Sequence, residues 1–297
     1  MDQTSATALT RRGLAAGITA FTLWGLFPGY WKTIHWLDAW ETVALRALLT
    51  IPVLTVILLA RHRLGAVLTA LKSWRVTGLH VITAALLAGN WLTFIWATQN
   101  ERIVEASLGY FLTPLANVLL GFLFLGERLR KGQKVAFALA VAGVALQVAA
   151  VGSLPWVALV LCGTFSLYGF LRKKSSLDSL EGLAVESVAA LPVALWFLSS
   201  HPAGHLAEGA FEWSMVLSMG IVTAVPLLGF ATAARLLTMA VLGILQFIAP
   251  SLQFLIGWLA YSEPVSPLRL ASFAVIWAGL AVFTAEAWKT SAATRKS

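Results

Sequence analysis

Charged residues are scarce in this sequence. Asp, Glu, Lys and Arg make up 11% of the 297 residues, whereas a typical soluble domain carries about 25%. Hydrophobic residues make up 59%, so too little polar surface remains to cover a water-soluble globule of this size. The composition excludes an ordinary soluble domain and predicts that lipid surrounds much of the chain.

Cysteine and clustered metal ligands are also nearly absent. The single cysteine, Cys162, excludes a disulfide framework and a cysteine-based metal site within one chain. The five histidines share no ligand spacing, and the sequence has no Walker A lysine loop and no recognisable catalytic Ser/His/Asp set. We therefore expect no metal, no cofactor and no enzymatic activity.

Long apolar runs dominate the sequence instead. A spanning helix needs about 20 mostly apolar residues. Ten runs approach that length, at 13–33, 38–60, 76–97, 104–125, 134–151, 154–171, 180–199, 214–236, 240–260 and 267–287. The expected fold class is all-α, a polytopic membrane protein with ten transmembrane helices.

The basic residues alternate between the two ends of these helices. With the N-terminus in the cytoplasm, 17 of the 21 Lys and Arg residues fall at cytoplasmic helix ends. The exceptions are Lys32, Arg102 and Arg269 near the outer ends, and Arg46 within a helix. The positive-inside rule then places both short tails, 1–12 and 288–297, in the cytoplasm. It also explains the net charge of +8 without a nucleic-acid partner.

An internal repeat divides the chain in two. At an offset of 136 residues, matched positions are Pro114 and Pro250, Gly121 and Gly257, Glu127 and Glu263, and Gly143 and Gly279. Offsets of 140 and 144 match Arg46 with Glu186, Pro52 with Pro192, and Trp24 with Tyr168. The predicted repeats are 13–151 and 154–287, with five helices each. Because each repeat has an odd number of helices, the second repeat crosses the membrane in the opposite orientation to the first. This inverted-repeat architecture is that of many secondary transporters.

Four stretches carry a family resemblance. They are Gly89-Asn-Trp-Leu-Thr-Phe-Ile-Trp-Ala97, Glu105-Ala-Ser-Leu-Gly-Tyr-Phe111, Leu125-Gly-Glu-Arg128 and Gly220-Ile-Val-Thr-Ala-Val-Pro226. With these the chain resembles, from about Gly13 to Trp288, the EamA-type branch of the drug/metabolite transporter superfamily. The resemblance implies two inverted five-helix EamA repeats in a bacterial cytoplasmic (inner) membrane. It also implies efflux of small metabolites or drugs, with chloramphenicol-like compounds among the expected substrates.

Ionisable residues within membrane helices are candidate functional groups, because burying them in lipid is costly. Arg46 and Glu186 are repeat equivalents of opposite charge, and we expect both to face a central cavity. The alternative is a buried ion pair that only joins the two halves. Glu105 either stabilises a helix N-terminus or offers a carboxylate at the outer mouth that binds protons or a cationic substrate.

Polar and aromatic residues supply the other candidates. Asn90 and Trp91, with Tyr110 nearby, either form a ligand pocket or bridge helices. Gln246 and Gln253 are seven residues apart and should share one helix face. The remaining candidates are the repeat equivalents Trp24 and Tyr168. We expect Pro28, Pro114, Pro226 and Pro250 near the protein interior, where their lost backbone hydrogen bonds can be replaced, and Glu127 and Glu263 at the membrane interfaces.

The leading functional hypothesis is a secondary transporter that works by alternating access. Its partners would be the lipid bilayer and a small-molecule substrate, with protons as a candidate coupling ion at Glu186 or Glu105. Arg46 would bind an anionic group or tune that acid. The alternatives are a non-transporting membrane scaffold or receptor, and a membrane-embedded enzyme acting on lipid-linked substrates.

Overall fold

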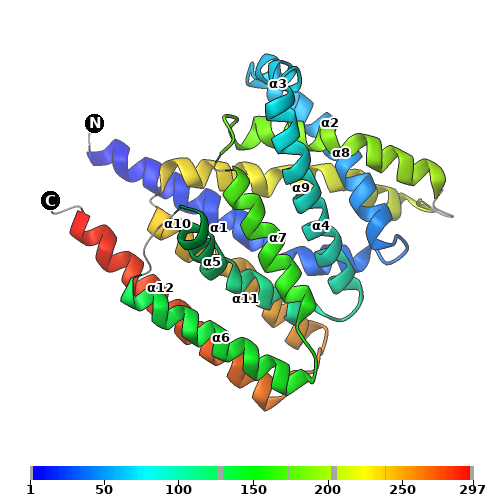
Figure 1. Ribbon diagram of the computed structural model, residues 1–297. Coiled ribbons are helices and arrows are strands. Elements are labelled where there is room, and N and C mark those ends of the chain that lie inside the picture. Colours follow the sequence, from blue (N-terminus) through cyan, green and yellow to red (C-terminus); the bar gives the residue numbers. More distant parts are fainter. Residues whose placement is uncertain (1–2, 126–129, 173, 202–205, 238, 295–297) are drawn as a thin grey trace.

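The computed structural model describes residues 3–125, 130–172, 174–201, 206–237 and 239–294, and within them the regular structure is helical, without a strand. Figure 1 shows the helices gathered into one bundle, with both chain ends on its left side. They are α1 (Gln3–Thr33), α2 (Ala39–Ala60), α3 (Leu64–Leu71), α4 (Trp74–Gln99), α5 (Ile103–Leu125), α6 (Lys131–Val151), α7 (Trp156–Arg172), α8 (Ser179–Ser200), α9 (Ala210–Leu236), α10 (Met239–Leu245), α11 (Ile248–Leu255), the π-helix η1 (Ile256–Ala260) and α12 (Pro267–Thr294).

The ten predicted spans all correspond to helices. Nine match one helix each. The remaining one, which is the ninth in chain order and was predicted over 240–260, is divided into α10, α11 and η1. The sequence analysis missed α3, an eight-residue helix between the second and third spans. Helices long and apolar enough to cross a membrane are α2, α4, α5, α6, α8, α9 and α12, while α7 and the α11–η1 segment are apolar but shorter.

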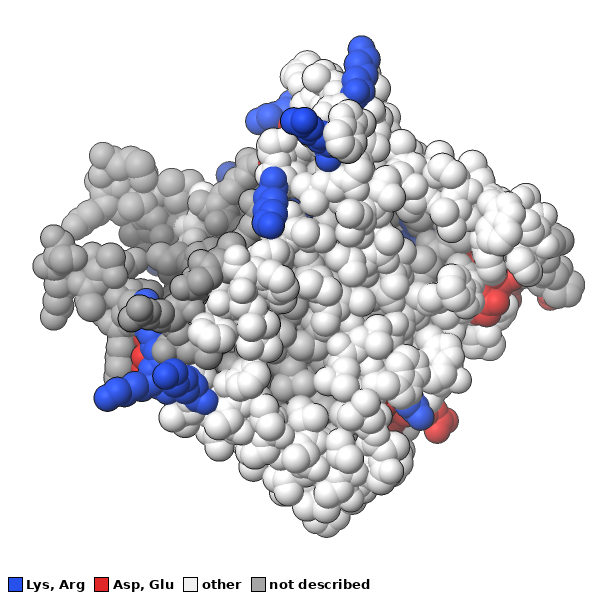
Figure 2. Space-filling view, in the orientation of Figure 1, with Lys and Arg blue, Asp and Glu red and all other residues white. Residues whose placement is uncertain are grey.

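The surface of the bundle has charged ends and an apolar band between them. In Figure 2, Lys and Arg gather over α3 and at the left, whereas Asp and Glu appear on the right. We call the end of the bundle that carries Arg61, Arg63, Lys72 and Arg75 the basic end, and the other the opposite end. The band between them exposes large apolar side chains that include Val56, Ile82, Val141, Val193, Leu217 and Leu259, as expected for a surface that faces lipid.

Helix packing shows a two-fold relation between the repeats. If α1, α2, α4, α5 and α6 are matched with α7, α8, α9, α10–α11 and α12, each major contact has its counterpart. The pair α1–α9 corresponds to α4–α7, α2–α9 to α4–α8, and α5–α7 to α1–α11, while α2–α8, α5–α11 and α6–α12 map onto themselves. This is the packing of two inverted five-helix repeats.

The second helix of each repeat begins in the same way. Asp38 caps α2 and exchanges hydrogen bonds with Glu41 in a capping box, and Asp178 does the same for α8 with Glu181. Each pair is offset by 140 residues, the offset that also relates Arg46 to Glu186. A capping box satisfies backbone N–H groups that a helix leaves unpaired at its first turn, so it fixes the first residue of both helices and the register that follows.

Two glycines allow the last helices of the repeats to cross closely. A Cβ atom added at Gly143 of α6 would lie 3.0 Å from the Ser272 carbonyl oxygen, and one added at Gly279 of α12 would lie 3.0 Å from the Ala136 carbonyl oxygen. Both pairs of equivalents, Gly143 with Gly279 and Ala136 with Ser272, are 136 residues apart. The crossing of α6 and α12 therefore lies on the two-fold axis, and small residues permit its close approach.

The ninth span is interrupted at Gln246 and Phe247. Pro250 lacks an N–H group and its ring clashes with the carbonyl of the fourth residue before it, Gln246. The chain makes a turn there, where the Phe247 N–H donates to the Ile244 carbonyl. The span predicted over 240–260 is therefore present but discontinuous. Discontinuous spans of this kind occur at the binding sites of secondary transporters.

Candidate functional site

Arg46 is a buried cation surrounded by aromatic rings. It lies seven residues after the start of α2, about 10 Å along the helix axis, and is 3% exposed. Its Nε donates a 2.7 Å hydrogen bond to Thr223 Oγ1 of α9. The guanidinium carbon lies 3.7 Å from the ring centroid of Trp91 on α4 and 5.1 Å from that of Trp31 on α1. Four helices from both repeats therefore meet at this side chain.

Asn90 and Tyr110 lie next to the Arg46 site and connect three helices. The Tyr110 hydroxyl donates to Asn90 Oδ1 at 3.0 Å. Asn90 Nδ2 in turn donates to the Leu161 carbonyl and to Thr164 Oγ1 of α7. Asn90 thus joins α4, α5 and α7, whereas its neighbour Trp91 faces Arg46.

Glu186 belongs to a second polar cluster, between α4, α7 and α8. Its Oε1 accepts a 2.7 Å hydrogen bond from Thr83 and lies 3.3 Å from His80 Nδ1. Tyr168 donates to its Oε2 at 3.3 Å, and Arg172 Nε lies 3.7 Å from Oε1. Glu186 is 2% exposed, so this cluster neutralises the carboxylate within the protein.

The two charged equivalents do not pair with each other. The ion pairs found among the described residues join Glu186 to Arg172 and His80, and none joins it to Arg46. The alternative prediction of an ion pair that joins the two halves was therefore wrong, and a common cavity stays a prediction. An inverted repeat relates the two halves by an axis in the membrane plane. Such an axis exchanges depths, so Arg46 lies nearer the opposite end and Glu186 nearer the basic end.

The carboxylate of Glu105 is held by a neighbouring helix rather than by its own. Its Oε1 accepts a 3.0 Å hydrogen bond from the Val157 N–H at the first turn of α7, and its Oε2 lies 3.4 Å from Arg102. Glu263 does the same for α5, since its oxygens accept from the backbone N–H groups of Ile103 and Val104. Glu263 is 2% exposed, so it is a buried helix cap at the opposite end. Glu127 lies outside the described residues.

The remaining predicted residues are separate from Arg46. Trp24 packs against Phe21 and Phe230, with ring centroids 5.5 and 5.8 Å away. Gln246 is half-buried in the turn between α10 and α11. Gln253 donates to the Trp24 carbonyl at 3.1 Å, and this carbonyl is the one that Pro28 leaves unpaired.

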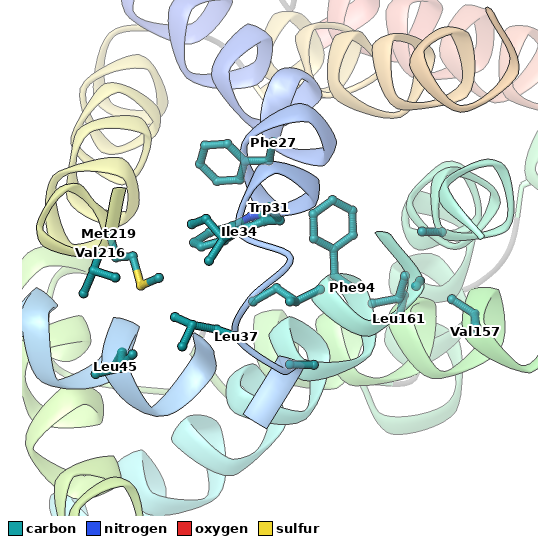
Figure 3. Packing of buried hydrophobic residues seen from close by; sticks show 14 residues of the cluster. Phe27, Trp31, Ile34, Leu37, Leu45, Phe94, Val157, Leu161, Val216 and Met219 are labelled. Atoms are coloured by element: carbon teal, nitrogen blue, oxygen red, sulfur yellow. The ribbon is translucent and has the colours of Figure 1, made fainter. Parts of the chain in front are cut away.

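Access to Arg46 differs between the two ends of the bundle. Towards the opposite end, Figure 3 shows Trp31, Ile34, Leu37, Leu45, Val216 and Met219 packed together from α1, the segment after it, α2 and α9. We call these six residues the apolar seal. From the basic end a groove enters between α2, α8 and α9, lined by residues that include Leu54, Leu183, Ala224 and Leu228. The groove runs towards the level of Thr223, since Ala224 follows Thr223 in the sequence, but its lining ends at Leu54, about 12 Å along α2 from Arg46. At the opposite end a second hollow, lined by residues that include Lys32, Trp36 and Asp38, ends on Leu37 of the apolar seal.

Sequence reasoning missed several members of both clusters. Thr223 and Thr83 are 140 residues apart, as are their charged partners Arg46 and Glu186, so the repeat offset could have identified both threonines. His80 could have been noticed as an ionisable residue within an apolar run. Arg172 had been interpreted only as an anchor at a helix end, and nothing in its local sequence distinguishes it from the other basic residues.

Comparisons with known proteins agree on one family. The model of the EamA-like transporter family matches residues 11–149, essentially the first repeat. An uncharacterized transporter of Pseudomonas aeruginosa is 44% identical over 96% of this chain and 97% of its own. Protein RarD of Salmonella typhimurium is 39% identical over 94% of this chain and 96% of its own. A protein of P. aeruginosa named chloramphenicol-sensitive protein RarD is 32% identical, with 91% and 92% covered.

A solved structure shows the same fold. The crystal structure of another protein, 22% identical in sequence, superimposes with a TM-score of 0.63 and covers 91% of this chain and 96% of its own.

Proposed function

The chain belongs to the EamA-like transporter family, whose members are multi-pass membrane transporters of small substrates, and we propose that it exports small metabolites or drugs by alternating access. One relative is named for chloramphenicol sensitivity. We propose that compounds of that size, chloramphenicol among them, enter the site from the cytoplasm and leave on the outer side.

The observation that carries this proposal is the unequal access to Arg46. The apolar seal separates Arg46 from the opposite end, while the groove between α2, α8 and α9 leads towards it from the basic end. In an alternating-access cycle one repeat rocks against the other around a fixed site. The arrangement fits a state closed outside and partly open inside, and a non-transporting scaffold would need no such groove.

The orientation follows from the charges at the helix ends. We propose that the basic end faces the cytoplasm, because cytoplasmic loops of membrane proteins are enriched in Lys and Arg. Both termini then lie in the cytoplasm, and the apolar seal closes the outer side.

Within this cycle the two polar clusters have different roles. We assign the substrate to Arg46 and Trp91, with Tyr110 and Asn90 beside them. Glu186 and Glu105 remain the two candidate proton sites. Proton uptake by Glu186 would weaken its contacts with His80 and Arg172 and proton release would restore them, which would couple the charge to the packing of α4 against α8.

The test is substrate flux in proteoliposomes with a panel of metabolites and drugs that includes chloramphenicol. We expect Arg46→Ala and Glu186→Gln each to lower flux at least tenfold while the protein remains folded. The matched control is Arg75→Ala, which removes an exposed arginine at the start of α4 and should leave flux unchanged. If folded Arg46→Ala protein transports substrate at the wild-type rate, Arg46 is not part of the substrate site.

A further inference from the structure

Arg46 differs from the other buried charges of the described residues. Glu186 contacts Arg172 and His80, Glu181 contacts Arg63, and Glu105 and Glu263 accept backbone hydrogen bonds. Arg46 is equally buried, yet within the described part of the chain its guanidinium has one hydrogen-bond acceptor, Thr223, and no carboxylate. Its charge is therefore not balanced by the protein.

Such an arrangement is costly unless something else supplies the negative charge. A guanidinium does not give up its proton under physiological conditions, so it cannot become neutral on burial, and an unpaired buried charge strongly destabilises a fold. The face of Trp91 offsets only part of this through a cation–π contact. With Nε engaged by Thr223, the two terminal amino groups remain as a parallel pair of donors, which suits the two oxygens of an oxyanion.

A second group nearby also lacks a partner. The indole Nε1 of Trp31 is buried and makes no hydrogen bond within the described residues. Its ring centroid is 5.1 Å from the guanidinium carbon of Arg46. A buried donor without an acceptor is rare and calls for an explanation. An oxyanion at the edge of the Trp31 ring, where the indole N–H points, could accept from this N–H and from a terminal amino group of Arg46.

We propose that the preferred substrate is a small organic monoanion, with an oxyanion head such as a carboxylate or sulfonate and a flat apolar body, which the site binds more tightly than neutral compounds such as chloramphenicol. This inference rests on the proposed function, since it names the ligand class of the same site. The head binds the terminal amino groups of Arg46 and the Trp31 N–H. The body lies among the apolar side chains beside Arg46, where it buries apolar surface, while the Arg46 guanidinium covers one face of the Trp91 ring.

A negative substrate also fixes the direction and the driving force. Bacterial membranes are negative inside, so moving one negative charge outward is favoured by about 50-fold in concentration ratio for every 100 mV. The membrane potential then drives export of a monoanion, and a proton at Glu186 would act on the packing of the helices and not as the source of the driving force. Transport of this substrate is electrogenic, and an inside-negative potential accelerates it.

Binding to the purified protein in detergent tests the ligand class. Benzenesulfonate is permanently ionised, and benzenesulfonamide is its neutral analogue of similar shape. We expect calorimetry to show at least tenfold tighter binding of benzenesulfonate, and Arg46→Gln to abolish this preference. Arg75→Gln, with an unchanged site, should retain it. Equal binding of both compounds, binding of neither, or a preference that survives in folded Arg46→Gln protein would overturn the proposal.

A flux measurement separates this inference from the proposed function. In proteoliposomes we expect outward benzenesulfonate flux to rise with an inside-negative potential. Binding that depends on Arg46 but without any flux would leave the anion site standing and remove the transport function. Conversely, flux of neutral compounds without any preference for the anion would keep the transport function and remove the inference.

Discussion

At the scale of single residues, two threonines form hydrogen bonds with side chains of opposite charge. Thr223 accepts a hydrogen bond from Arg46, and Thr83 donates one to Glu186. A hydroxyl can do either, because it carries both a donor and acceptor lone pairs. The equivalent contacts between the repeats, α2 with α9 and α8 with α4, therefore hold a cation in one case and an anion in the other.

The Glu186 cluster leads to a prediction about stability. Arg172→Met removes the cation beside a carboxylate that is 2% exposed and leaves its charge uncompensated. Breaking a buried pair in this way costs about 3–5 kcal/mol. We expect a clearly lower unfolding temperature in detergent, with much of the loss recovered in the double variant Arg172→Met with Glu186→Leu.

The matched control is the neighbouring pair Arg63 and Glu181. Its nitrogen–oxygen distance is shorter, 3.1 Å, but the Arg63 side chain is 55% exposed. Because exposed ion pairs contribute about 0–1 kcal/mol, Arg63→Met should have a much smaller effect. If Arg63→Met destabilised the protein as much as Arg172→Met does, the cluster would not be the buried charge network described above.

The site residues show where sequence reasoning succeeds and where it ends. An arginine in an apolar run is costly anywhere in lipid, so Arg46 could be selected from the sequence alone. The side chains that surround Arg46 could not be selected in this way, because they come from α1, α4 and α9 and depend on how these helices pack. The inverted repeat was recognised, but it also places the two equivalents at different depths, and this was not used to reject the alternative of a direct ion pair between Arg46 and Glu186.

At the scale of the helices, proline determines how the spans are built. Pro28, Pro114, Pro226 and Pro250 are all buried, as predicted from their lost backbone hydrogen bonds. In α1 the replacement is visible, since Gln253 donates to the Trp24 carbonyl that Pro28 leaves free. In the ninth span Pro250 instead coincides with a break. The repeat equivalent Pro114 lies within an unbroken α5, so the sequence alone could not indicate which proline would interrupt its helix.

The contact between Gln253 and Trp24 can be tested with a double-variant cycle. Gln253→Leu leaves the Trp24 carbonyl without a donor in an apolar setting, which costs about 1–3 kcal/mol. Adding Pro28→Ala restores a backbone N–H that can donate to this carbonyl. We therefore expect thermal unfolding to show that Pro28→Ala is more favourable in the Gln253→Leu background than in the wild type. Strictly additive effects would show that Gln253 does not compensate for Pro28.

At the scale of the whole molecule, the two-fold relation extends from helix caps to helix crossings. The capping boxes at Asp38 and Asp178 and the glycines at the crossing of α6 and α12 all occur in pairs. Symmetry of this kind gives two equivalent ways of packing one repeat on the other. One of these two arrangements would have the apolar seal at the opposite end and the groove at the basic end. The other arrangement would open the opposite end and expose Arg46 there.

Alternating access would open the two ends of the bundle in turn, and site-specific thiol labelling measures this exposure at each end. In a Cys162→Ala background, Leu228→Cys places a thiol in the groove and Leu37→Cys places one in the apolar seal. An impermeant maleimide is applied from each side of the membrane, with and without a substrate identified by the flux panel. We predict that any condition that raises labelling of Leu37→Cys from the outside, such as the presence or absence of substrate, also lowers labelling of Leu228→Cys from the inside. Labelling that rises at both positions together, or that changes at one position without the other, would contradict alternating access in this protein.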